Sequence, residues 1–204
     1  MIGIIDYGLG NISAFGNIYK RSNIQYRVIK NVEDFEGVTK FILPGVGAFD
    51  YAMRLLNNSG LRDELESQVL TEKKPVLGVC VGMQIMGDFS DEGESRGLGW
   101  IPGRVKLFDK ETIKRKPKIP HMGWNQVNPL KDQSIFSGVD YEVGFYFLHS
   151  YYFEPENEEE ILATSDYGNQ FACALHRDNI YAFQFHPEKS LENGTRLLRN
   201  FASV

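Results

Sequence analysis

The sequence contains little cysteine and no long hydrophobic run. Only two cysteines, Cys80 and Cys173, occur among 204 residues, which is too few for a disulfide framework and fits a reducing cytoplasm. No apolar stretch approaches the roughly 20 residues that cross a bilayer, and the start of the chain lacks the basic segment of a signal peptide. We therefore expect a cytoplasmic protein that makes no membrane contact and in which Cys80 is free to react.

The chain is also short of positive charge and of histidine. Asp and Glu number 27 against 22 Lys and Arg, a formal net charge of −5, which argues against a nucleic-acid partner. The four histidines are scattered. His186 and Glu188 lie close in sequence, but no second histidine or cysteine pair accompanies them, so we expect no metal. The glycine loop at 6–11 lacks the third glycine of a dinucleotide site, and we expect no cofactor.

The first half of the sequence alternates short apolar runs with amphipathic segments. The apolar runs predict strands at residues 2–5, 25–29, 41–43 and 76–79, and helical spacing predicts helices near 11–22 and 60–72. Later aromatic runs at 141–148 and 181–185 predict antiparallel strands, and residues 196–201 predict a closing helix. We expect one α/β domain over residues 1–204, with an open, mostly parallel central sheet, flanking helices on both faces, and antiparallel strands in the second half.

Residues 78–82, Gly-Val-Cys-Val-Gly, directly follow the apolar run at 75–77. With sulfur in place of oxygen, they match the strand-to-helix turn that projects a nucleophile. The two glycines allow the strand and the helix to approach closely, and the helix N-terminus favours the Cys80 thiolate. The following helix is expected to bury one side, formed by Met83, Ile85, Met86 and Phe89. A buried structural cysteine fits the pentapeptide equally well.

A cysteine nucleophile requires a base, and His186 is the candidate. It follows the strand-like run at 181–184, and Glu188 stands two residues further on. A carboxylate at that spacing can return to the imidazole and hold its tautomer and orientation. A structural histidine remains the alternative.

Residues 45–47, Gly-Val-Gly, lie just after another predicted strand. Two glycines around one residue leave backbone N–H groups unobstructed, so Gly45, Val46 and Gly47 suit an oxyanion hole, with the amide of Val81 as a further donor. Taken alone, the segment fits a tight turn between strand and helix better.

These motifs together resemble a known family. Residues 78–84 with His-Pro-Glu at 186–188 resemble the class I, or triad, glutamine amidotransferases. Within them, the glutaminase subunits of imidazole glycerol phosphate synthase (HisH type) are similar in five segments, at residues 6–11, 44–49, 120–125, 149–151 and 186–190. The hexapeptide Pro-His-Met-Gly-Trp-Asn at 120–125 is the most discriminating of these. The resemblance spans essentially the whole chain.

The resemblance implies a glutaminase that acts on L-glutamine. Cys80 would attack the side-chain amide, His186 would act as base and then as acid, and Glu188 would orient His186. Gln84 and Glu92 stand at positions that help to bind glutamine, Glu92 being suited to the α-ammonium group. Three further residues would lie along the bound glutamine: His149, Ser150 and Tyr151.

The resemblance also implies a heterodimer with a (β/α)₈-barrel synthase subunit of the HisF type, which receives the ammonia. The contact face would contain Asn11, Lys189 and the hexapeptide residues His121, Met122, Gly123, Trp124 and Asn125. An exposed Trp suits an interface anchor. The oxyanion loop would become productive only when the liganded barrel binds.

Three functions remain open on the sequence. The first is ammonia supply for imidazole glycerol phosphate and aminoimidazole carboxamide ribotide synthesis in the histidine pathway. The second keeps the chemistry but supplies a sugar amidotransferase of surface-polysaccharide synthesis through a paralogous HisF-like partner; residues 192–198 and the ending at 200–201 are slightly reminiscent of that branch. The third is a catalytically inactive scaffold, which the intact Cys80, His186 and Glu188 argue against.

Overall fold

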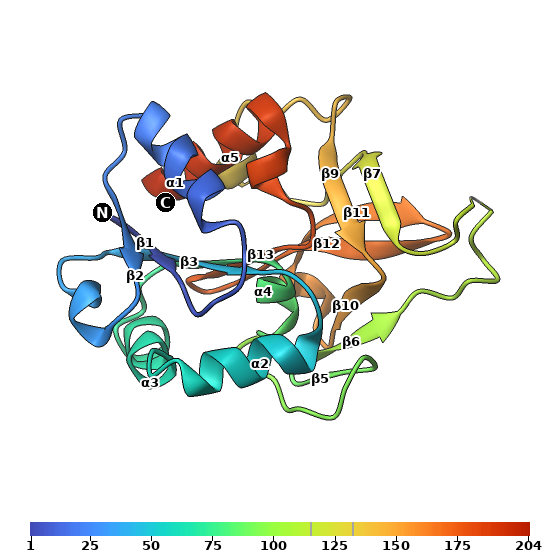
Figure 1. Cartoon of the computed structure of the whole chain (residues 1–204). Helices are drawn as coiled ribbons and strands as arrows, with labels where there is room; N and C mark the ends of the chain where they lie inside the picture. The colour runs from blue at the N-terminus through green and yellow to red at the C-terminus, as the bar shows by residue number, and fades with distance from the viewer. Residues whose placement is uncertain (115, 132) are drawn as a thin grey trace.

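The computed structural model describes residues 1–114, 116–131 and 133–204, and a large mixed sheet runs through the molecule (Figure 1). Its parallel part contains five neighbouring strands, in the order β2 (Tyr26–Ile29), β1 (Ile2–Ile5), β3 (Lys40–Gly45), β4 (Val76–Cys80) and β13 (Ile180–Phe183). The inner strands of this part are buried along nearly their whole length, as expected where helices cover both faces of a parallel sheet.

The second half of the chain extends this sheet with antiparallel strands, as the sequence predicts. The order continues through β12 (Asn169–Arg177), β10 (Tyr151–Pro155) and β6 (Gly103–Leu107), with β5 (Phe89–Ser90) parallel to β6 at the edge. Strand β13, however, comes from the predicted antiparallel run at 181–185 and is parallel to β4 and antiparallel only to β12. Two more strands lie off this path, β11 (Ile161–Tyr167), which pairs with β12, and β8 (Asn128–Pro129), which pairs with β11. A separate antiparallel pair contains β7 (His121–Asn125) and β9 (Phe145–His149).

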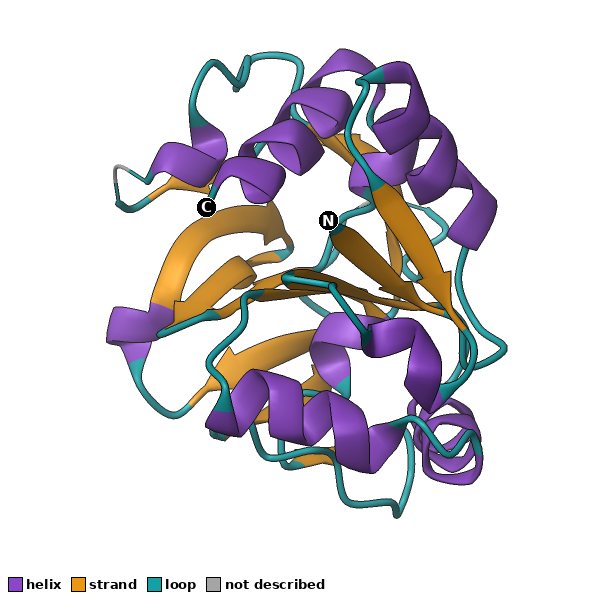
Figure 2. Ribbon diagram, turned by 90° about the vertical axis from the view of Figure 1, so that its left-hand side faces the viewer, coloured by secondary structure: helices purple, strands orange, loops and turns teal. Residues whose placement is uncertain are grey.

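Helices cover both faces of the sheet, which confirms the expected layering. In Figure 1, α1 (Ile12–Arg21) and α5 (Leu191–Ser203) lie on one face, and α2 (Phe49–Asn58) and α3 (Arg62–Glu66) on the other. Figure 2 shows the same two helical layers with the strands between them. The short α4 (Val81–Gln84) follows β4 directly. Single turns complete the structure: η1 (Val32–Phe35), η2 (Ser67–Thr71), η3 (Ser134–Phe136), η4 (Glu158–Glu160) and η5 (Pro187–Lys189).

The helix after Cys80 is shorter than predicted. It ends at Gln84, and Phe89 lies in β5 with 45% of its surface exposed rather than on a buried helix side. The cause is a distant segment: Leu98 donates its backbone N–H to Ile85 O, and Trp100 donates to Met86 O. The carbonyls of Ile85 and Met86 therefore accept hydrogen bonds from this segment and not from later residues of a helix, so the helix does not continue to Phe89.

Two other helices differ from their predictions. Helix α2 is not among the predicted elements, although Phe49, Ala52, Met53 and Leu56 form its buried side. The closing helix α5 begins at Leu191, five residues before the predicted start.

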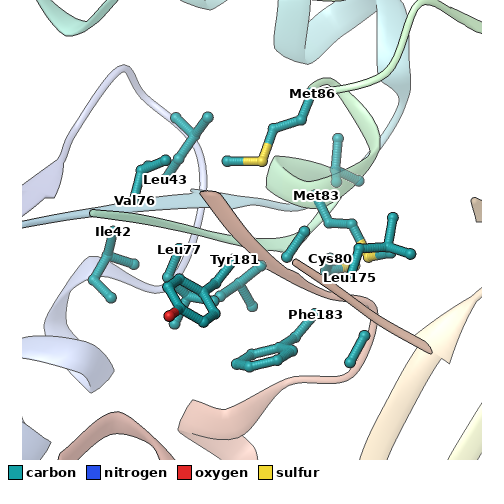
Figure 3. Close-up of a cluster of buried hydrophobic side chains, with 14 of the residues drawn as sticks. Ile42, Leu43, Val76, Leu77, Cys80, Met83, Met86, Leu175, Tyr181 and Phe183 are labelled. Atoms are coloured by element: carbon teal, nitrogen blue, oxygen red, sulfur yellow. The ribbon is translucent and has the colours of Figure 1, made fainter. Parts of the chain in front are cut away.

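The core centres on the parallel strands. Ile42, Leu77 and Phe183 come from three adjacent strands, are 0% exposed, and lie in one cluster in Figure 3. Cys80 belongs to the same cluster at the carboxyl end of β4. Since β3, β4 and β13 all end at this side of the sheet, their following loops converge there. Within the described residues, no helix is long and apolar enough to cross a membrane.

Candidate active site

Cys80 occupies a strained turn between β4 and α4. Its backbone φ is 55° and its ψ is −114°, a conformation that residues other than glycine rarely adopt and that is typical of functional turns. A Cβ on Gly82 would lie 1.9 Å from Leu43 O, and one on Gly78 would lie 2.8 Å from Gly82 O. Neither clash could be relieved by a side-chain movement. The predicted steric need for glycine on both sides of Cys80 is thus confirmed.

His186 follows β13 and pairs with Glu188. The Nδ1–H group donates to Oε1 of Glu188 at 2.9 Å, and both side chains are 2% exposed. Because a carboxylate only accepts, Nδ1 carries a proton, and Nε2 is the ring nitrogen that exchanges a proton with Cys80. Burial alone lowers the pKa of His186, but hydrogen bonds to Cys80 and Glu188 outweigh it and raise the pKa to about 10. The geometry is that of an oriented base beside a nucleophile.

The oxyanion-loop candidate lies beside this pair. Gly45 is the last residue of β3 and stands opposite Cys80 in the parallel register. Gly47 has a φ of 88°, and a Cβ there would touch nothing within 4 Å. The hydroxyl of Tyr7 donates to Pro44 O at 2.8 Å and fixes the start of the loop. Burial raises the pKa of Tyr7 strongly, so the phenol remains a donor.

A cavity of about 270 Å³ joins these elements, a size that suits a small molecule rather than a polymer. It brings together residues from six separate segments: Val46, Gly47, Cys80, Val81, Gln84, Glu92, Pro120, Leu148, His149, Ser150, Tyr151, His186 and Lys189. Most of these are residues that the sequence motifs single out. Glu188 lies outside the lining, on the Nδ1 side of His186.

Glu92 reaches the cavity from the loop after β5. Its Oε2 accepts the backbone N–H of Phe49 at 2.8 Å, at the N-terminus of α2, where a negative charge is favoured. Asp50 holds the same loop by accepting from the backbone N–H groups of Glu94 and Ser95, and these hydrogen bonds lower the pKa of Asp50. The structure therefore holds a carboxylate at the cavity wall.

Gln84 and the 149–151 segment also line the cavity. Gln84 is buried, and its Nε2 donates to Tyr151 O at 3.1 Å and to Gln184 Oε1 at 3.0 Å. His149 is buried as well and donates from Nδ1 to the same Tyr151 carbonyl at 2.7 Å. These contacts fix the loop that would lie along a ligand.

The hexapeptide divides between the interior and the surface, because it forms strand β7 with alternating side chains. Met122 and Trp124 are 57% and 41% exposed, whereas His121 is 1% exposed. His121 is therefore too buried to touch a partner protein itself, and it can affect a contact face only through the conformation of β7. Trp124 contacts Tyr146 edge-on at 6.5 Å, and Lys189 Nζ lies 5.8 Å from the Tyr146 ring. Asn11 is exposed and caps α1, its Oδ1 accepting from Ala14 N–H.

Comparisons with known proteins agree with this geometry. The imidazole glycerol phosphate synthase subunit HisH of Bdellovibrio bacteriovorus is 51% identical over 204 residues, and that of Leptospira borgpetersenii is 48% identical, each alignment covering 100% of both chains. The family model described as glutamine amidotransferase class-I matches residues 4–204. The chain is a class I glutamine amidotransferase of the HisH family. The resemblance inferred from the sequence is confirmed.

Solved structures confirm the fold class of this glutamine amidotransferase. A crystal structure of a glutamine amidotransferase superposes with a TM-score of 0.73 at 21% identity, over 100% of this chain and 99% of the other. A second glutamine amidotransferase, from Thermotoga maritima, gives 0.64 at 15% identity, over 99% of this chain and 82% of the other.

Three residues beside Cys80 or the 45–47 loop are given no role by the sequence motifs, although Tyr7 lies inside the 6–11 segment. Gln184 and Leu148 contact the Cys80 sulfur, and Tyr7 contacts Pro44 at the start of the neighbouring loop. Gln184 and His186 are two residues apart at the end of one strand, a spacing that brings side chains to one side and could have identified Gln184. Within the described residues, no group of three or more His, Cys, Asp or Glu could hold a metal ion.

Proposed function

We propose that this chain hydrolyses L-glutamine to glutamate and ammonia with Cys80, His186 and Glu188 as the catalytic triad. One observation carries the proposal: Cys80 projects from a strained turn into a cavity beside a histidine that a buried carboxylate orients. Family membership supplies the reaction class. We take residues 1–204 as one catalytic domain.

The reaction has two steps. The Cys80 sulfur, whose thiol proton has passed to His186, attacks the carbon of the glutamine side-chain amide. The Val81 N–H and the peptides of Gly45, Val46 and Gly47 stabilise the oxyanion. His186 then protonates the departing ammonia, which leaves a glutamyl thioester on Cys80. Water deprotonated by His186 attacks the thioester carbon, the carbon–sulfur bond breaks, glutamate is released, and the Cys80–His186 pair recovers its proton.

Glutamine would be held at its other end by the cavity walls. Glu92 presents a carboxylate to the α-ammonium group, since its Oε2 is already anchored at the N-terminus of α2. Gln84, His149, Ser150 and Tyr151 would line the chain of the substrate. No step requires a metal or a cofactor.

We further propose that the ammonia passes to a (β/α)₈-barrel subunit of the HisF type in a cytoplasmic heterodimer. The relatives are named as subunits of imidazole glycerol phosphate synthase, so the barrel product would be imidazole glycerol phosphate with aminoimidazole carboxamide ribotide, in histidine biosynthesis. The contact face would contain Asn11, Lys189, Met122, Gly123, Trp124 and Asn125, with His121 behind it. The exposed Met122 and Trp124, which follow the cavity-lining Pro120, favour this face.

A second destination for the ammonia has one observation in its favour. A relative from Pseudomonas aeruginosa, 46% identical over 100% of both chains, is named imidazole glycerol phosphate synthase subunit HisH 2, and the numeral fits an organism with more than one such subunit. A paralogue could supply a sugar amidotransferase of surface-polysaccharide synthesis.

The test is a glutaminase assay of the chain with and without a liganded barrel subunit. We expect turnover that depends on the barrel, and Cys80→Ala should lose glutamine-dependent synthesis while the ammonia-dependent reaction of the barrel persists. Loss of both reactions would contradict the division of labour. Growth of a histidine auxotroph that carries this gene supports the histidine pathway; failure with an active barrel pair supports the second destination.

A further inference from the structure

Gln184 is a buried amide at the nucleophile. It follows β13, is 0% exposed, and its Nε2 lies 3.9 Å from the Cys80 sulfur, within hydrogen-bond range for sulfur. We propose that Gln184 is a positioning residue that donates a hydrogen bond to Cys80, favours its thiolate form and keeps the sulfur aimed at His186. This inference deepens the proposed function and rests on it.

The direction of the Gln184 amide follows from its partners. The carbonyl of Tyr151 can only accept, so the group of Gln84 that faces it must be the donor Nε2. The same Nε2 donates to Gln184 Oε1 at 3.0 Å. With its oxygen toward Gln84, Gln184 must turn its own NH₂ group toward the sulfur. A backbone carbonyl thus determines which atom of Gln184 faces Cys80.

A second chain of hydrogen bonds ends on the same carbonyl. Asn125 is oriented by backbone groups, because its Oδ1 accepts from Gln126 N–H and its Nδ2 donates to Asp166 O. Nδ2 therefore also donates to His121 Nε2 at 3.1 Å, and His121 Nδ1 donates to His149 Nε2 at 3.0 Å. His149 Nδ1 then donates to Tyr151 O.

The two chains of hydrogen bonds meet at the carbonyl of Tyr151, to which Gln84 and His149 both donate. Burial, together with the neighbouring His121, holds the pKa of His149 well below its ordinary value, so the imidazole stays neutral and its Nε2 remains an acceptor. The Tyr151 carbonyl is thus held from both sides, and the orientation of Gln84 and Gln184 does not change through the neutral pH range.

Two opposing contacts act on the Cys80 sulfur. Leu148 O, 3.9 Å away, accepts the thiol hydrogen and so favours the neutral thiol. Gln184 donates to the sulfur and so favours the thiolate, since a hydrogen bond to the charged form stabilises that form. The charged or titratable groups around Cys80 are His186, Tyr7, His149, Glu92 and Lys189. A Gln184→Met substitution adds no charge to this set, whereas Gln184→Glu adds one carboxylate to it.

The test compares Gln184→Glu and Gln184→Met in the full chain bound to its barrel subunit. Glu keeps the shape but replaces the donor by an acceptor, and Met removes the donor without adding charge. We expect the pH midpoint of Cys80 alkylation by iodoacetamide to rise by about one unit in Gln184→Met, the usual size of one hydrogen bond to a charged group. It should rise by at least as much in Gln184→Glu, whose carboxylate also repels the thiolate. The kcat for glutamine should fall about tenfold, with KM nearly unchanged.

Gln170→Glu is the matched control, because Gln170 is exposed on β12 and receives the same charge change. Its alkylation midpoint should equal that of the unsubstituted chain. An unchanged midpoint in both Gln184 variants, with melting temperatures equal to that of the unsubstituted chain, would overturn the proposal. Alkylation does not depend on glutamine chemistry. A shifted midpoint therefore supports the role of Gln184 even where glutaminase activity is absent, an outcome that would contradict only the proposed function.

Discussion

Nδ1 of His186 lies 2.9 Å from Oε1 of Glu188, and both side chains are almost completely buried. Removal of the negative charge of Glu188 should therefore affect catalysis directly. We expect Glu188→Gln to lower kcat by about 10²–10⁴-fold, since the amide can present its NH₂ group to the ring and reverse the tautomer of His186. Steady-state glutaminase kinetics with the barrel subunit would measure this. A kcat within about threefold of the unsubstituted enzyme, in a variant that melts normally, would contradict the role of Glu188.

The pKa of His186, raised to about 10 by its partners against the effect of burial, also predicts a pH-dependent stability. The ordinary value in the unfolded chain is about 6.5. Below this value both states bind the proton and the stabilisation is fully present. Between about 6.5 and about 10 the folded state retains a proton that the unfolded state has lost, so the free energy of unfolding falls as pH rises.

This fall should be smaller in Cys80→Ala, because the variant lacks one of the two hydrogen bonds that raise the pKa of His186. Urea unfolding at about pH 6, 8 and 10 measures the effect. Tyr and Lys titration is common to both chains, so the difference between them isolates the pair. Parallel curves for the two chains would show that Cys80 does not stabilise protonated His186.

We expect a substitution of Glu92 to weaken glutamine binding more than it slows the chemical step. Its carboxylate lines the cavity while Oε2 is anchored at Phe49 N–H. Glu92→Gln should raise the KM for glutamine by about ten- to hundredfold, the range for a hydrogen bond between charged groups, with a smaller effect on kcat. Asp91→Asn is the matched control, because Asp91 instead accepts from Arg104 Nε at 2.9 Å. Equal KM changes in both variants would remove Glu92 from the binding site.

The grouping of Cys80, His186 and Glu188 and the position of the 45–47 segment beside Cys80 could be predicted from sequence, because each depends on a few adjacent residues at a strand end. The glycines beside Cys80 are a local steric requirement, and the two-residue spacing of His186 and Glu188 is visible in the chain. The roles of more distant groups could not be predicted in this way. Phe89 lies outside the predicted helix because the backbone N–H groups of Leu98 and Trp100, which bind the last carbonyls of that turn, come from another segment.

The sequence also could not show which residues of the hexapeptide are buried and which are exposed. The sequence motif treats its residues alike, but the pairing of β7 with β9 sets His121 opposite His149 in the interior and leaves Trp124 exposed. The network from Asn125 to Tyr151 likewise joins residues from separate strands and loops. The spacing of residues within any one segment does not indicate this network.

Trp124 is the residue on which the partner face can be tested most directly. It is 41% exposed and packs edge-on against Tyr146, which also lies under Lys189 Nζ. Trp124→Ala should raise the Kd for the barrel subunit by about fivefold or more, the minimum for a truncated interface anchor, and the ammonia-dependent reaction of the barrel should be unchanged. Phe89→Ala is the control, since Phe89 is similarly exposed but lies at the far edge of the central sheet, in β5. Titration calorimetry of both variants separates the outcomes: equal affinities for the two would exclude Trp124 as an anchor of this face.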